Sequence, residues 1–189
     1  MTGRTHDQIA AAGALAIPAV ALAIRHPLPI DASAILLCGA LATSRAPDYT
    51  EPLAHTAHRT WTHWLPTGLL VALAFTLALA MIAPPGHRGF ALAFGTGMLV
   101  GWWMHSLADG LTDSGCWILR RRRQALLPRR FRIHVYTITK RRNRWTGQTT
   151  TTKRPSRGER TYFRGAQLAT FALAGLQVVT FAHSIAPPT

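Results

Sequence analysis

Apolar residues gather in a few long runs along this chain, and short polar stretches separate the runs. The most apolar run is 65–83, and because about 20 helical residues cross the ~30 Å hydrocarbon core, it is a strong candidate for a membrane span. Runs at 9–24, 90–107 and 165–186 have comparable lengths, whereas the run at 30–43 is short for a span. The pattern therefore predicts an all-α integral membrane protein with about five apolar helices in a bundle.

Charge is separated from these runs. The chain of 189 residues is 48% hydrophobic but carries a formal net charge of +14. Of its 21 Lys and Arg residues, 15 lie between Arg120 and Arg160. One basic loop on an apolar body is typical of an integral membrane protein and suits neither an ordinary globular domain nor a disordered tail.

The chain divides into three parts on this basis. Residues 1–116 hold four membrane helices, 117–164 form a basic cytoplasmic loop, and 165–189 hold the last membrane helix. Within the loop, residues 131–139 alternate with period two and residues 148–152 offer a partner, which predicts a small β-hairpin. The first apolar run has an alternative interpretation as a secretory signal, because Ala19-Val20-Ala21 resembles a cleavage site.

The positive-inside rule assigns the basic loop, and with it the N-terminus, to the cytoplasmic side of the membrane. Counting helices back from the loop then assigns the charge-poor turns 25–31 and 84–89 to the outside. This count brings eight polar residues to the cytoplasmic side: His6, Asp48, Glu51, His55, His58, His63, His105 and Asp109. A metal site needs such convergence from separate elements.

The chemistry of this set favours metal binding. His105 and Asp109 are four residues apart at the end of an apolar run, so on a helix they share one face. Polar groups at that depth are functional candidates, although a helix-end hydrogen bond would also explain the pair. Imidazole and carboxylate suit zinc, and also manganese or iron. Such a metal lowers the pKa of water and would allow hydrolysis of an ester or phosphodiester.

Four segments carry a resemblance to a known family. They are His6, Pro47-Asp48-Tyr49-Thr50-Glu51, His58-Arg59-Thr60-Trp61-Thr62-His63 and His105-Ser-Leu-Ala-Asp109, with Gly158-Glu159 as a further match. In order and spacing the chain resembles the YdjM-type family of inner-membrane proteins, which implies a membrane-bound metal-dependent hydrolase. Thr50 and Glu51 stand where that family has an aspartate and a histidine.

We therefore expect a divalent metal, with zinc as the first choice, held by His6, Asp48, His58, His63, His105 and Asp109. Asp109 or Glu51 would act as general base, and Glu159 is a further candidate residue. The substrate would be a lipid or a phosphoester, and membrane lipids would be partners. The alternative is a non-enzymatic membrane protein whose basic loop binds anionic lipid, a partner protein or, less favoured, nucleic acid.

Overall fold

A computed structural model describes residues 3–53, 60–112, 115–116, 125–126, 132–133, 135–142 and 149–185. The described chain is mostly helical. Its helices are α1 (Gly3–Ala23), α2 (Ile30–Thr43), α3 (Ala46–Leu53), α4 (Leu65–Ile82), α5 (Arg88–Gly110) and α6 (Arg157–Ile185). Two short 3₁₀ turns, η1 (Trp61–His63) and η2 (Pro85–His87), precede α4 and α5, and the strands are β1 (Tyr136–Arg142) and β2 (Thr149–Pro155).

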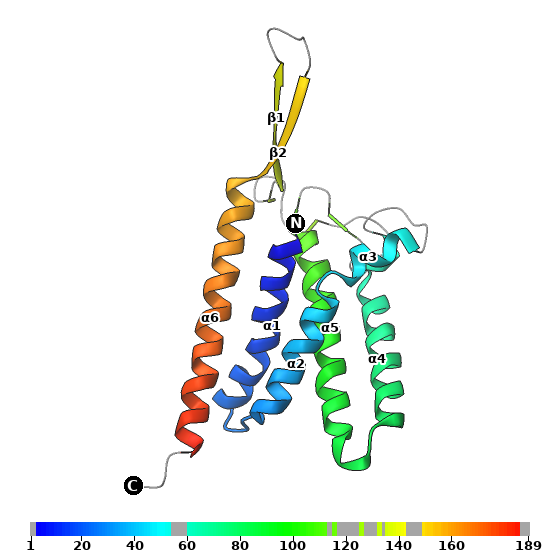
Figure 1. Cartoon of the computed structure of the whole chain (residues 1–189), viewed down its shortest axis with the longest axis vertical. Helices are drawn as coiled ribbons and strands as arrows, with labels where there is room; N and C mark the ends of the chain where they lie inside the picture. The colour runs from blue at the N-terminus through cyan, green and yellow to red at the C-terminus, as the bar shows by residue number, and fades with distance from the viewer. Residues whose placement is uncertain are drawn as a thin grey trace.

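The five longer helices run side by side, and α3 lies across one end of them (Figure 1). Helix α5 packs against α1, α2 and α4, while α6 packs against α1. Successive helices alternate in direction, so α1, α4 and α6 begin at the end where α2 and α5 finish. The helix α3 and the two strands also lie at this end. We call it the polar end of the bundle.

Glycines set the close contact between α2 and α5. A Cβ added at Gly97 would collide with the carbonyl oxygen of Leu36, and one added at Gly101 would collide with that of Ala40. A Cβ added at Gly95 would collide with the side-chain hydroxyl of Thr76 in α4. Small residues let helix backbones approach this closely.

Helix α3 differs from what the sequence predicts. The two prolines in 44–52 favour an irregular loop, yet residues Ala46–Leu53 are helical. Pro47 sits in the first turn, where a missing backbone N–H costs little because that group has no partner within the helix. The helix places Asp48 and Glu51 three residues apart and therefore on neighbouring positions of one face.

Two other helices begin earlier than their apolar runs. Helix α1 starts at Gly3, ahead of the apolar run at 9–24. Helix α6 starts at Arg157, ahead of the apolar run at 165–186. The Ser156 hydroxyl oxygen accepts a hydrogen bond from the backbone N–H of Glu159 at 3.0 Å, which stabilises this polar first turn.

By length and composition, two of the described helices could cross a membrane. These are α1, with a mean hydropathy of 1.3, and α4, with 2.2; α2 is apolar but shorter. Many apolar side chains of α4 are exposed, including Leu70 at 65% and Leu77 at 56%. In a soluble protein such a surface would be unusual, and lipid would cover it in a membrane.

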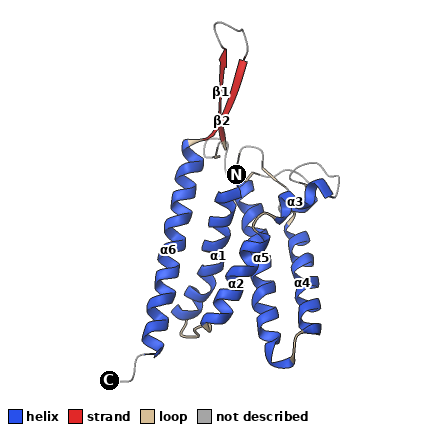
Figure 2. Ribbon diagram, in the orientation of Figure 1, coloured by secondary structure: helices blue, strands red, loops and turns tan. Residues whose placement is uncertain are grey.

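The strands form one antiparallel pair that extends away from the polar end (Figure 2). Its register runs from Tyr136 opposite Pro155 to Arg142 opposite Thr149. The sequence predicts strands at 131–139 and 148–152. The observed strands overlap these segments, and each extends beyond the predicted C-terminal end.

Candidate metal centre

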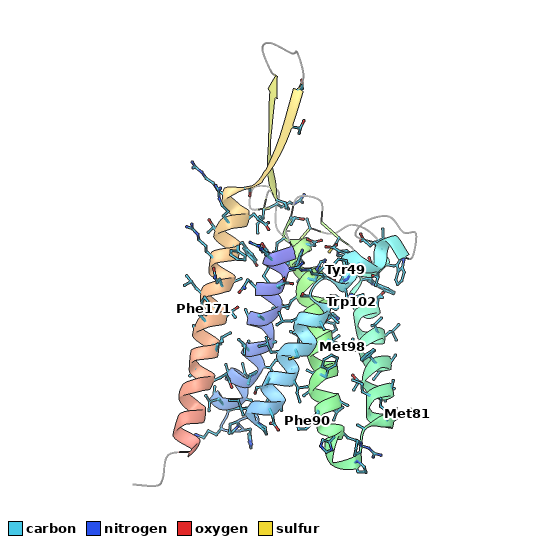
Figure 3. All side chains as sticks on the ribbon, viewed as in Figure 1. Tyr49, Met81, Phe90, Met98, Trp102 and Phe171 are labelled. Carbon is cyan, nitrogen blue, oxygen red and sulfur yellow. The ribbon has the colours of Figure 1, made fainter. Side chains whose placement is uncertain are left out.

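Four side chains from three elements meet at the polar end. Asp48 comes from α3, His63 from η1, and His105 and Asp109 from the last turns of α5. One ligand atom from each lies within 4.8 Å of the other three, and all but Asp48 are buried. Figure 3 labels Trp102 near this end of α5 and Tyr49 on α3, and labels Phe90 at the opposite end of α5.

The distances within this four-residue group are short. His63 Nε2 lies 3.1 Å from His105 Nε2 and 3.3 Å from Asp109 Oδ2. Asp48 Oδ1 lies 3.5 Å from the Nε2 atoms of both histidines. His105 Nε2 and Asp109 Oδ2 are 3.9 Å apart. A tetrahedron with bonds of about 2.0–2.1 Å has edges of about 3.3 Å, close to these values.

A backbone carbonyl fixes the protonation of His105. Its Nδ1 lies 2.6 Å from the carbonyl oxygen of Ser44, and because a carbonyl can only accept, Nδ1 carries the proton. Asp7 in turn holds this segment, since it accepts from the Ser44 hydroxyl at 2.6 Å and pairs with Arg45. The contact with Ser44 orients the ring of His105 so that Nε2 faces the other three residues of the group.

A carboxylate orients His63. Its Nδ1 lies 3.2 Å from Glu51 Oε1, which also accepts from the Thr62 hydroxyl at 3.2 Å. The Trp102 indole donates to the carbonyl oxygen of Thr62 at 2.9 Å and fixes the η1 turn. A metal-binding histidine usually has a carboxylate beside one ring nitrogen while the other nitrogen faces the metal.

The electrostatics of the group favour a cation. Burial acts to raise the pKa of Asp48, but its contacts with His105 and His63 outweigh this and hold the pKa below the usual range. Burial acts to lower the pKa of His63, but the carboxylates of Asp109 and Asp48 outweigh it and raise the pKa. Acceptors thus converge from all four residues, and they require a proton or a metal ion between them.

These residues fit a divalent metal. Two imidazole nitrogens and two carboxylate oxygens are ligands that zinc, manganese and iron accept. The charges of Asp48 and Asp109 balance those of a divalent ion. In addition, the buried Oδ1 of Asp48 has no hydrogen-bond partner within the described chain. A buried acceptor without a partner is costly, so a ligand role accounts for it.

His6 lies beside this group rather than within it. Its ring stacks on that of His105 with centroids 3.8 Å apart, and its Nε2 lies 3.4 Å from Asp109 Oδ1. The side chain is 1% exposed, and neither ring nitrogen has a hydrogen-bond partner among the described residues. His6 can therefore exchange a proton with Asp109 or contribute to a larger site.

The remaining candidates lie further out. Glu51 sits behind His63, on the side away from the Nε2 atoms. Glu159 lies in the first turn of α6 and accepts a hydrogen bond from the Thr5 hydroxyl at 2.7 Å. Thr5 directly precedes His6, so this contact joins α6 to the site. His58 and His55 lie outside the described residues.

Sequence analysis did not identify several supporting residues. Ser44 contributes a backbone carbonyl, for which no side-chain pattern exists. Trp102 is only 4% exposed and belongs to the core. Thr62 is fully buried. Its position within the His-Arg-x-x-Thr-His segment is the one feature of the sequence that indicates a role at the site. These three residues orient the metal-binding candidates.

Comparison with known families supports the membrane assignment. The profile described as YdjM inner membrane protein matches residues 1–184. The chain belongs to the YdjM family. The match runs from before α1 to the last turn of α6, so the four-residue group and His6 lie in a YdjM inner membrane protein. Searches of curated proteins and of solved structures found no match.

Proposed function

We propose that this YdjM family protein is a metal-dependent hydrolase that acts at the cytoplasmic membrane face. Asp48, His63, His105 and Asp109 would hold the metal. The observation that carries the proposal is the 3.1 Å separation of two Nε2 atoms with two carboxylate oxygens beside them. In His105 the Nδ1 atom faces the Ser44 carbonyl and in His63 it faces the Glu51 carboxylate, so the Nε2 atom of each ring faces the group.

The residues around the group would divide the work of hydrolysis. A bound divalent cation supplies Lewis acidity and makes water a better nucleophile. Ser44 and Glu51 keep the two imidazole rings in their binding orientation. His6 Nε2, beside Asp109 Oδ1, would take up the proton that an attacking water loses. Glu51 is then a positioning residue for His63 rather than the general base.

The position of the group suggests the substrate class. The elements that carry the group, α3, η1 and the last turns of α5, lie at the end of the bundle where the candidate spans α1 and α4 begin (Figure 1). A substrate that is itself anchored in lipid would present an ester or phosphoester at this depth. We therefore propose a lipid ester or phosphoester, with zinc as the first choice of metal and manganese or iron as alternatives.

Metal content tests the first half of the proposal. Protein purified in detergent should carry near-stoichiometric divalent metal by elemental analysis, and His105→Ala should lose it. His87→Ala, which changes a histidine at the opposite end of α5, is the matched control and should retain the metal. A wild-type protein that binds no added zinc, manganese or iron would refute the metal site.

Hydrolysis is tested separately on the metal-loaded protein. Chromogenic phosphodiesters and carboxylic esters serve as probes, followed by lipids in mixed micelles. His6→Gln should retain the metal but lose activity by about 10²–10⁴-fold, the usual contribution of a general base. A metal-loaded wild type that cleaves none of these compounds would favour the non-enzymatic alternative.

A further inference from the structure

A pocket lies between α1 and α6, apart from the four-residue group. It has a volume of about 320 Å³. Helix α1 contributes Arg4 and Thr5, and α6 contributes Glu159, Arg160, Phe163 and Arg164. Both helices begin at the polar end, so the pocket opens where the bundle would meet the membrane surface.

The charge of this pocket is strongly positive. Arg4, Arg160 and Arg164 are exposed, and Glu159 is the only acid among the lining residues. The Glu159 carboxylate is buried at 1% exposure and already accepts from Thr5 at 2.7 Å. Guanidinium groups match phosphate oxygens in charge and in planar, two-pronged geometry. The pocket is therefore suited to a phosphate group.

The surface below the pocket is apolar. Arg160 and Arg164 are one turn apart on α6, and Leu168 continues the same face one turn further along. Leu168 is 70% exposed, and so is Phe171 at 66%, which Figure 3 labels on α6. A free phosphate would use only the arginines, whereas a lipid would also cover these side chains.

We propose that this pocket binds the phosphate headgroup of an anionic phospholipid, whose acyl chains lie along α6. The lipid would bridge Arg4 of α1 to Arg160 and Arg164 of α6. It would support the side-chain contacts between the same helices, which are Thr5 to Glu159 and Thr170 to the carbonyl oxygen of Gln8 at 3.3 Å. This lipid site does not depend on metal binding or on hydrolysis.

Lipid binding can be measured on the full-length protein in detergent by native mass spectrometry. Short-chain phosphatidylglycerol is the anionic probe and phosphatidylcholine is the zwitterionic control. Because a basic residue near a membrane surface contributes enough to change affinity about fivefold, Arg160→Gln and Arg164→Gln should each weaken phosphatidylglycerol binding by about fivefold. The double variant should lose on the order of 25-fold.

Arg157→Gln is the matched control, because Arg157 is an exposed arginine of α6 that does not line the pocket. It should bind phosphatidylglycerol as the wild type does. An equal loss in Arg157→Gln, or equal affinity of the wild type for phosphatidylcholine, would overturn the proposal. Glycerol phosphate that displaces the lipid at equal concentration would also overturn it, because the site would then be one for soluble phosphate.

Discussion

The two histidines of the four-residue group have different partners at Nδ1. His105 donates to the neutral carbonyl of Ser44, whereas His63 faces the carboxylate of Glu51. A negative charge behind the ring makes Nε2 a stronger base and a stronger metal ligand. His63 is therefore the residue at which a proton competes most directly with a metal ion.

This competition predicts a pH dependence of metal affinity. The pKa of His63 is raised in the metal-free protein, and a ligand must lose its proton before it binds metal. Affinity should thus rise with pH, by about tenfold per unit while one proton is released, and level off above the pKa of His63. Competition with a chelator between pH 5.5 and 8.5 measures this. Affinity that does not change over that range would contradict the proton-competition argument.

The Glu51 carboxylate gives a second prediction. Glu51→Gln keeps the shape of the side chain but removes the charge behind His63, so metal affinity should fall by about 10- to 100-fold. Asp31→Asn, an exposed acid at the far end of α2, should leave the affinity unchanged. Titration of both variants with zinc would measure this. If Glu51→Gln instead kept full affinity and lost hydrolysis, Glu51 would be the base.

At the residue scale, spacing in the sequence located the parts of the site that lie on one element. His105 and Asp109 share a face because a helix repeats every 3.6 residues. The carbonyl of Ser44 could not be found this way, since its role depends on where α2 ends relative to α5. His6 was identified, but its stacking on His105 is a tertiary contact that no local pattern encodes.

At the scale of elements, α5 carries two of the four candidate metal ligands, His105 and Asp109, and also the glycines that pack it against α2. Gly101 is four residues before His105, which is about one helical turn. The α2–α5 contact therefore fixes the height at which His105 meets Ser44 at the end of α2. Any change that separates the two helices should disturb the four-residue group as well as the packing.

Gly101→Ala tests this coupling. Its Cβ would meet the carbonyl oxygen of Ala40, so the variant should be destabilised by about 1–3 kcal/mol and should bind metal more weakly. Gly89→Ala, in the first turn of the same helix, has no atom within 4 Å of the added Cβ and should unfold at or slightly above the wild-type temperature. Thermal unfolding in detergent compares the two. Equal stability of both variants would show that α5 can shift without cost.

Hydropathy identified where the helices are but not where they begin. All five apolar runs are helical, yet α1 and α6 extend several residues beyond them at the polar end. These polar first turns carry His6 and Glu159. Helix α3 was missed because Pro47 and Pro52 signal a break, although a proline in the first turn is tolerated. The errors thus gather where polar side chains interrupt the hydrophobic pattern.

At the scale of the whole molecule, alternation of helix direction brings the polar residues together. An odd number of crossings between any two segments would have put them at opposite ends. The sequence predicted this convergence by counting apolar helices back from the basic loop, and the described chain has His6, Asp48, His63 and Asp109 at one end. The charge of the basic loop predicts which side of the membrane this end faces.

We expect the polar end to face the cytoplasm, because 15 of the 21 Lys and Arg residues lie between Arg120 and Arg160. Cysteine labelling in intact cells tests this once Cys38 and Cys116 have been replaced by serine. Gly86→Cys, in the turn at the opposite end, should react with a membrane-impermeant maleimide. Arg157→Cys, at the polar end, should react only after the membrane is permeabilised. The reverse pattern would put the metal group on the outer face, and a substrate would then have to reach it from outside the cell.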